Sequence, residues 1–351
     1  MRRSFILALI AFVLVTGTVM AEEATLIDFS ELTANYPADD PRHNERTLVD
    51  FSLAAGSSYT EEEKAEMKIS LSIPDWEIAL ASSSENVDTV TNSEVRAAPV
   101  REGAEQYGGQ TVLGARVYFP NQPYNGWALI EPPFEIPAYA DLTEVADDGS
   151  LTVPQGEEGA GTKFDNFGVV KNVGVLRSVT VTVNGLNFPH GMSIVLQDEN
   201  NEEQEIFMGY LDFDGWRQIT WMNPNYINDV RDRELRTFPL YPNLSPMRKL
   251  IGIRIYRDAS MQGGDFITYV KDISLTYDRA VLQLERDIND EGVWGILQDR
   301  EAARREAELR NLGNIQVLRY LEERKMHSTE NGEAAAEGEE GNGGEQEGGG
   351  E

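Results

Sequence analysis

The residues best suited to chemistry in this sequence are its three histidines and its 60 acidic residues, and neither set is arranged as a known catalytic site. His43, His190 and His327 lie far apart, and no two have the spacing of metal ligands on a helix. The chain has no cysteine, which excludes thiol nucleophiles, disulfides and cysteine metal sites. Nucleophile-elbow, phosphate-loop and dinucleotide motifs are also missing from the sequence. With so many carboxylates, acidic pairs do not indicate a glycosidase. We therefore predict no catalytic, cofactor-binding or metal-binding residue.

Aromatic residues gather between Gln204 and Trp221, in the stretch QEIFMGYLDFDGWRQITW. Two extended runs, Glu205–Leu211 and Trp216–Trp221, flank Asp-Phe-Asp-Gly at residues 212–215. Aspartate and glycine favour the backbone angles of a tight reversal, so the pattern predicts a β-hairpin. The Asp-x-Asp-Gly sequence resembles a calcium loop, but the other ligand positions of an EF-hand are missing.

Three of the aromatic residues, Trp216, Trp221 and Tyr226, have the flat rings that stack on sugars. Trp216 and Trp221 are five positions apart, so on a regular strand they face opposite sides. At most one of them then belongs to a concave sugar-binding face, and the other belongs to the core. A carbohydrate-binding module is thus one hypothesis, and ordinary core packing is the other.

Charge is distributed unevenly along the chain. The formal net charge is −30, which makes nucleic acid and anionic lipid poor partners. Residues 227–257 are an exception, because seven bases outnumber three acids there. This segment either docks on an acidic partner, such as another copy, or pairs with acids of its own domain. The candidate interface residues are Arg231, Arg233, Arg236, Arg248 and Lys249.

Residues 1–21 have the features of a secretory signal. Arg2 and Arg3 precede an apolar run, Phe5–Val15, and small residues lead to a cleavage site after Ala21. The apolar run is about half the roughly 20 residues that a membrane-spanning helix needs. We expect a cleaved leader and an exported protein with no membrane anchor.

Period-two alternation of apolar residues recurs between residues 22 and 280 and predicts an all-β fold. The residues from Asn121 to Pro137 and from Asp147 to Gly161 have loop-like compositions, the second set favouring a flexible connection. Met192–Leu196 is expected to pair with Gln204–Leu211, and Asn184-Gly185 to form a turn. We predict an antiparallel β-sandwich or jelly roll of the carbohydrate-binding, galactose-binding-like kind. The segments expected to be strands include Met67–Ile73, Val112–Phe119, Val179–Val183, Ile251–Ile255 and Ile273–Tyr277.

The composition changes after the predicted sandwich. Residues 281–326 are rich in Ala, Glu, Arg and Leu, with Glu-to-Arg pairs four apart, and predict a helical segment. Its apolar stripe is thin, so the helix either packs on its own sandwich or a neighbour, or is a solvated charged helix. Residues 327–351 carry many acids and are expected to form a disordered acidic tail.

Several stretches of the chain resemble the flagellar filament outer layer (sheath) protein family of spirochaetes. The stretches are TLIDF at Thr25–Phe29, FDNFGVVKNVGVLRSVTVTVNGLNFPHGMSIVLQD from Phe164, WMNPNYI at Trp221–Ile227, LIGIRIYRDAS at Leu250–Ser260 and FITYVKDISLTYD at Phe266–Asp278. The resemblance implies a non-enzymatic subunit in the periplasm that coats a core of flagellin subunits and affects filament stiffness and motility. It also implies contacts with other copies of the chain or with a second sheath protein.

Overall fold

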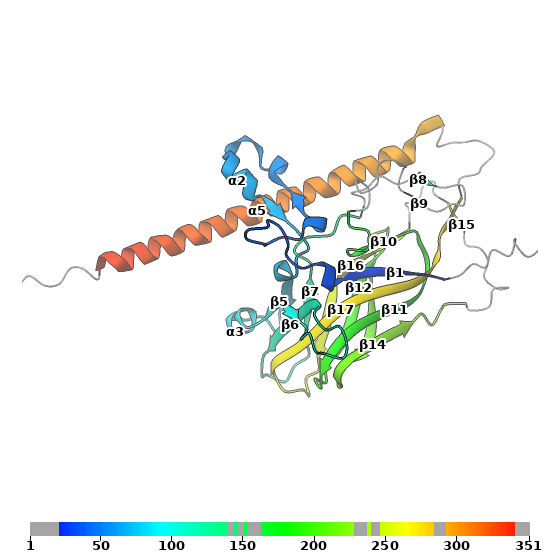
Figure 1. The fold of residues 1–351 in the computed structure, drawn as a ribbon, viewed down its shortest axis with the longest axis horizontal. Coiled ribbons are helices and arrows are strands. Elements are labelled where there is room, and N and C mark those ends of the chain that lie inside the picture. Colours follow the sequence, from blue (N-terminus) through cyan, green and yellow to red (C-terminus); the bar gives the residue numbers. More distant parts are fainter. Residues whose placement is uncertain are drawn as a thin grey trace, which may run out of the picture.

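The computed structural model describes residues 21–138, 144–145, 151–152, 163–227, 237–239, 246–283 and 293–340. The predicted leader, most of the predicted flexible connection and the last part of the acidic tail lie outside these residues. Within them, two six-stranded antiparallel sheets face each other and a long helix crosses one end of the sandwich (Figure 1). The all-β prediction is thereby confirmed.

The first sheet has the strand order β14-β11-β17-β6-β5, with β1 also paired to β17. β17 is long enough to pair with β11 on one side and with both β6 and β1 on the other. The strands are β1 Glu22–Asp28, β5 Glu94–Pro99, β6 Thr111–Phe119, β11 Val173–Leu186, β14 Asp214–Met222 and β17 Gly264–Arg279.

The second sheet has the order β13-β12-β16-β7-β4, with β10 also paired to β16. Consequently β13 and β14, which follow each other in sequence, are edge strands of opposite sheets. The strands are β4 Glu77–Leu80, β7 Gly126–Glu131, β10 Val169–Lys171, β12 Gly191–Gln197, β13 Glu203–Tyr210 and β16 Met247–Arg257.

Two-stranded sheets, two short helices and the long helix α5 lie outside the sandwich. Three two-stranded sheets pair β2 with β3, β8 with β9 and β15 with β18. Their strands are β2 Val49–Asp50, β3 Lys68–Ile69, β8 Glu144–Val145, β9 Leu151–Thr152, β15 Thr237–Pro239 and β18 Val281–Gln283. The helices are α2 Glu61–Glu66, α3 Val87–Thr91 and α5 Ile296–Glu340.

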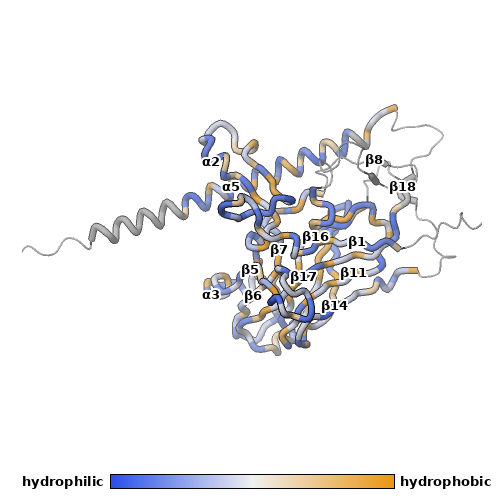
Figure 2. Tube along the Cα trace, in the orientation of Figure 1, coloured by the Kyte–Doolittle hydropathy of each residue, from blue (hydrophilic) through white to orange (hydrophobic). Residues whose placement is uncertain are grey.

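The core lies between the two sheets because their alternating apolar residues face inward. Val179, Val181 and Val183 of β11 are fully buried, and so are Ile273 and Leu275 of β17. Their partners from the second sheet include the buried apolar residues of β12 and β16. Figure 2 shows apolar positions recurring along these strands. The period-two pattern therefore identified the inward faces correctly.

The predicted hairpin at residues 204–221 is wrong in its pairing. β13 pairs with β12 and β14 pairs with β11, so Leu211–Phe213 carries the chain from one sheet to the other. Aspartate and glycine suit this sharp change of direction as well as they suit a hairpin, and Gly215 has a positive φ of 84°. By contrast, the predicted pairing of Met192–Leu196 with Gln204–Leu211 is confirmed.

Three other local predictions are also corrected. Asn184-Gly185 is not a turn, because β11 continues to Leu186 and pairs with β14 there. The residues of Met67–Ile73 are largely buried, but only Lys68 and Ile69 form a strand. The Pro-rich stretch from Asn121 to Pro137 contains β7, because Gly126–Glu131 lies between its prolines and keeps its backbone donors.

The helix boundaries also differ from those predicted. Residues 281–283 form β18, α5 begins at Ile296, and it continues through Glu340 into the segment expected to be disordered. Alanine and glutamate are strong helix formers, which explains why the helix extends past residue 326. Sequence composition alone did not locate this end.

Candidate interaction surfaces

The middle of α5 packs on the sandwich and on the segments that surround it. Leu312 is 5% exposed and Gln316 is 4% exposed. A Cβ at Gly313 would lie only 2.7 Å from the Cβ of Ala54, so the helix approaches the 3-10 turn Ser52–Ala54 closely. Of the two alternatives for the helix, the structure thus supports packing on its own domain.

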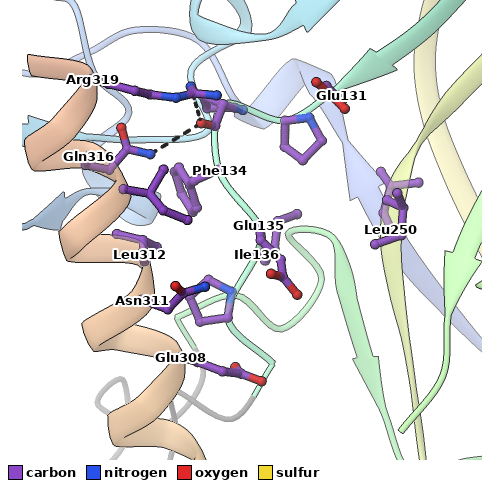
Figure 3. Close-up of a pocket in the computed structure, with 15 residues that line it drawn as sticks. Glu131, Phe134, Glu135, Ile136, Leu250, Glu308, Asn311, Leu312, Gln316 and Arg319 are labelled. Atoms are coloured by element: carbon purple, nitrogen blue, oxygen red, sulfur yellow. Dashed lines mark hydrogen bonds between the residues drawn. The ribbon is translucent and has the colours of Figure 1, made fainter. Parts of the chain in front are cut away.

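Hydrogen bonds and ion pairs attach the helix between Gln316 and Arg324, and Figure 3 shows those of Gln316 and Arg319. The backbone oxygen of Pro133 accepts hydrogen bonds from Gln316 at 3.5 Å and Arg319 at 2.9 Å. Arg319 also pairs with Glu77 of β4 at 2.8 Å, and Arg324 pairs with Glu63 of α2. The helix thereby joins segments that are distant in sequence.

A groove of about 270 Å³ lies between α5 and the stretch Glu131–Pro137. Pro133, Phe134 and Ile136 line its sandwich side, and Leu312 and Ile315 line its helix side (Figure 3). Burial and the carboxylate of Glu77 raise the pKa of Glu131 above its usual range. The groove combines apolar side chains with the charged Glu131, Glu135, Glu308 and Arg319, and it lies where the helix contacts the sandwich.

Several apolar side chains of α5 face solvent. Leu309, Leu318 and Met326 are 41% to 64% exposed. All residues from Glu322 to Met326 are exposed, and Figure 1 shows the helix continuing well past the body of the protein. These exposed apolar side chains are accessible for contact with a neighbouring molecule.

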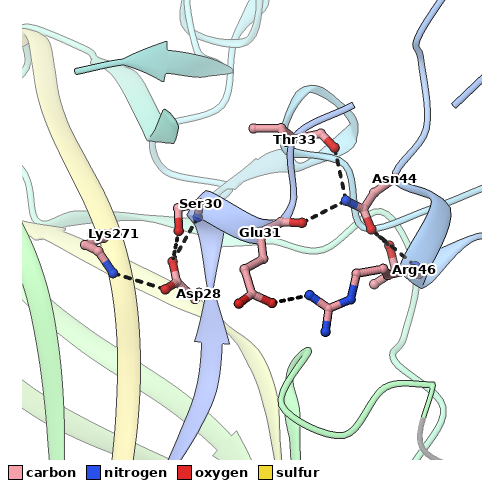
Figure 4. Close-up of polar contacts among 8 residues, drawn as sticks. Asp28, Ser30, Glu31, Thr33, Asn44, Arg46 and Lys271 are labelled. Atoms are coloured by element: carbon pink, nitrogen blue, oxygen red, sulfur yellow. Dashed lines mark hydrogen bonds and ion pairs between the residues drawn. The ribbon is translucent and has the colours of Figure 1, made fainter. Parts of the chain in front are cut away.

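A polar network anchors the N-terminal segment (Figure 4). Asp28 at the end of β1 accepts hydrogen bonds from the backbone of Ser30 at 2.9 Å and from Lys271 of β17 at 3.1 Å. The side chain of Asn44 donates to the backbone oxygens of Glu31 and Thr33 at 2.8 and 3.0 Å. These contacts hold residues 28–44 against the first sheet.

The predicted basic interface is only partly described. Arg231, Arg233 and Arg236 lie outside the described residues. Lys249 is 2% exposed and its Nζ lies 2.6 Å from a carboxylate oxygen of Glu135, so its assignment to an open interface is corrected. A charge buried this deeply needs a partner within the protein.

Other bases of the same segment are also paired within the chain. A guanidinium nitrogen of Arg248 lies 3.5 Å from a carboxylate oxygen of Glu199, and one of Arg254 lies 2.6 Å from a carboxylate oxygen of Glu205. Arg257 is 1% exposed and donates to the backbone oxygens of Gln122 and Met261. The acidic partners of Arg248 and Arg254 are 49 residues away in sequence, which explains why local charge counting did not identify them.

The three candidate sugar-binding aromatic residues occupy different environments. Trp221 packs against the core, and Trp216 makes an edge contact with Tyr107, with ring centroids 5.0 Å apart. They lie on opposite faces of β14, as their odd spacing predicts. Tyr226 is 8% exposed and its hydroxyl donates to Asp278 at 2.9 Å, which corrects the suggestion that it stacks on a sugar.

The two histidines that the structure describes in detail, His43 and His190, lie in different environments. His190 is 5% exposed among Phe119, Phe188 and Phe266, and burial lowers its pKa to about 4. The Nδ1 atom of His43 lies 4.0 Å from a carboxylate oxygen of Asp75. Burial raises the pKa of Asp75 to about 7. Within the described ranges, no group of three or more acidic or histidine side chains is placed to hold a metal ion.

No helix in the described part of the chain has the length and apolar character that crossing a membrane requires. The fold and surfaces define an all-β sandwich with an attached, projecting helix.

Comparison with known proteins identifies the family. The family described as "Flagellar filament outer layer protein Flaa" matches residues 40–286. A flagellar filament outer layer protein of Spirochaeta aurantia is 48% identical over 326 residues, covering 93% of this chain and 94% of its own length. The protein of that name from Treponema pallidum (strain Nichols) is 44% identical over 333 residues, covering 93% and 95%. The chain belongs to the flagellar filament outer layer protein family, a family of structural filament proteins.

Solved structures similar to this chain include carbohydrate-binding modules. A carbohydrate-binding module of the β-sandwich superfamily has a TM-score of 0.28 at 14% identity, covering 58% of this chain and 57% of its own. A galactotriose complex of another such module has a TM-score of 0.26 at 8% identity, covering 58% and 90%. At these TM-scores the likeness carries no argument about ligands.

Proposed function

We propose that this protein is a structural subunit of the outer layer of the periplasmic flagellar filament. In this role it coats the flagellin core, and the layer increases filament stiffness and supports motility. The observation that carries the proposal is the 48% identity to a filament outer layer protein across nearly the full length of both chains. The leader-like residues 1–21 support export to the periplasm.

The shape of the protein supports a role in assembly. The core is packed with apolar side chains, while apolar residues of α5 remain exposed on a projecting helix. A layer of many copies multiplies weak contacts, so a modest contact per subunit is sufficient. We propose flagellin subunits as one partner, and other copies of this chain or a second sheath protein as the other.

Electron microscopy of filaments from cells that lack this protein tests the role directly. We expect a thinner filament, with the wild-type diameter restored when the gene is returned. Filaments of unchanged diameter, in cells shown to lack the protein, would contradict the proposal.

The contribution of the basic segment is tested by co-sedimentation. We propose that Arg231, Arg233 and Arg236 contact an acidic surface, so replacing all three by Glu should weaken binding to filaments. Replacing Arg42, Arg96 and Arg101 by Glu is a matched control, because these exposed residues give the same change in net charge. Equal sedimentation of both variants would remove the segment from the interface.

A further inference from the structure

The edge strands of the two sheets differ in how they are protected against pairing with another chain. An edge strand exposes unpaired backbone groups and pairs readily with another chain unless charges, bulges or prolines prevent it. β13 carries Glu203 and Glu205, and its pairing with β12 is interrupted by a register shift between Met192 and Ser193. β4 has only four residues, and β5 carries Glu94 and Arg96 and ends at Pro99. β1 is interrupted by a register shift after Thr25.

β14 has fewer of these forms of protection. Its nine residues, Asp214–Met222, pair with β11 without any register shift and contain no proline, and its charged residues are Asp214 at its start and Arg217. Among the strands that the structure describes, none pairs with the outer side of β14, which lies at the margin of the sandwich (Figure 1). The strand is about 30 Å long at roughly 3.4 Å per residue, which is enough for a full inter-subunit ladder.

Exposed apolar side chains lie near the same edge. Leu186 at the end of β11 is 39% exposed and Met222 at the end of β14 is 53% exposed. On β13, the edge strand of the other sheet, Phe207 and Tyr210 are 47% and 51% exposed and their ring centroids are 5.4 Å apart. Apolar surface beside an unpaired strand is typical of a surface that a partner covers.

The sequence of β14 is complementary to itself in an antiparallel pair. The only symmetric register that uses all nine residues places Gln218 opposite Gln218 of a second copy. Trp221 then lies opposite Gly215, and Trp216 lies opposite Thr220. An aromatic ring opposite a glycine or a β-branched residue is a favourable cross-strand pair. Arg217 lies opposite Ile219, so no like charges face each other.

We propose that β14 pairs antiparallel with β14 of a second copy and joins the first sheets of two subunits into one continuous sheet. The contact is isologous, so the same strand supplies both sides. The inference rests on the proposed function in one respect, because an outer layer brings copies of the chain to high local concentration. The proposed β14 contact specifies which surface one subunit presents to the next.

The lack of cysteine makes a cross-linking test clean. In the symmetric register the two Gln218 Cβ atoms lie about 5 Å apart, within reach of a short thiol-specific cross-linker. For Gln218→Cys we expect about ten-fold more covalent dimer than for the control, because pairing raises the effective concentration of the two thiols. The control is Arg96→Cys on β5, an exposed residue at the opposite edge of the same sheet.

Gln218→Lys provides the complementary variant. It places two like charges opposite each other and should reduce self-association, whereas Gln218→Thr should retain it. Equal dimer yields from Gln218→Cys and Arg96→Cys would overturn the proposal. So would a mixture of these two variants that cross-links only between one variant and the other, since such heterodimers indicate head-to-tail pairing of opposite edges.

The reaction is run both on coated filaments and on concentrated protein in solution. Cross-linking in solution detects the β14 contact in the absence of filaments. Co-sedimentation detects filament binding independently of cross-linking. Failure of wild-type protein to sediment with filaments would contradict the proposed function, whereas absence of the Gln218→Cys dimer in both settings would contradict the edge contact.

Discussion

The sandwich and helix α5 are stabilised by different kinds of contact. The sandwich buries apolar side chains from both sheets, and residues such as Phe266 and Ile273 are fully buried. The helix is attached by a short buried face around Leu312 and by polar contacts of Arg319 and Arg324. Burial of apolar area contributes more to stability than exposed ion pairs do. The sandwich should therefore unfold cooperatively, while the helix should detach at a lower free-energy cost.

The largest expected effect comes from truncating a core ring. Phe266 is fully buried, and its ring centroid lies 5.4 Å from that of Phe188. Phe266→Ala should lower the free energy of unfolding by about 3–5 kcal/mol, because it removes buried area and leaves a cavity. Denaturant unfolding measures this, and Phe207→Ala on the exposed face of β13 is the control. Equal losses in both variants would contradict the assignment of Phe266 to the core.

A smaller effect is expected at the helix. Leu312→Ala should weaken helix docking by about 2–3 kcal/mol and speed amide hydrogen exchange in residues 300–326, with little change in the melting temperature of the sandwich. Leu318→Ala, at a residue that is 60% exposed, should leave exchange unchanged. If Leu312→Ala lowers the main unfolding transition as much as Phe266→Ala does, the two regions form one cooperative unit.

The smallest effect depends on pH and lies within the sandwich. The pKa of His190 is lowered to about 4 by burial and by Arg257, so the folded state disfavours its charged form. Stability from the neutral ring is fully present above an unfolded pKa of about 6.5 and is lost as pH falls toward 4. At pH 5 the loss is about 2 kcal/mol by linkage.

His190→Phe should remove this loss. Among the residues that the structure describes, neither ring nitrogen of His190 has a hydrogen-bond partner, so phenylalanine leaves no donor or acceptor of these residues unsatisfied. We expect the melting temperature of the variant to fall less than that of wild type between pH 7.5 and pH 5. Parallel decreases in the two proteins would show that His190 does not carry the acid sensitivity.

The strands were predictable because each inward face repeats over several residues. Alternating valines in β11 and the alternation Ile273, Leu275, Tyr277 in β17 both identified buried faces. The reversal around residues 198–201 was also predictable, because the side chain of Asp198 accepts hydrogen bonds from the backbone of Asn200 and Glu202. Such local features are determined by neighbouring residues and are visible in sequence.

Pairing between distant segments was not predictable in the same way. The residues around Asp212-Phe213-Asp214-Gly215 fit a hairpin and a crossing between sheets equally well, and only the sheet order distinguishes them. Lys249 lies in a basic segment, but its partner Glu135 is 114 residues away. Leu312 was recognisable as part of an apolar stripe, while the surface that it packs on was not.

The length of α5 has a consequence for spacing. At about 1.5 Å per residue, α5 extends roughly 24 Å from Arg324, whose side chain pairs with Glu63 of the body, to its end at Glu340. A rigid helix of this length sets a fixed spacing, because any molecule bound at its end is held at that distance from the sandwich. Shortening the helix by one turn should change that distance by about 5 Å without altering any other contact of the subunit.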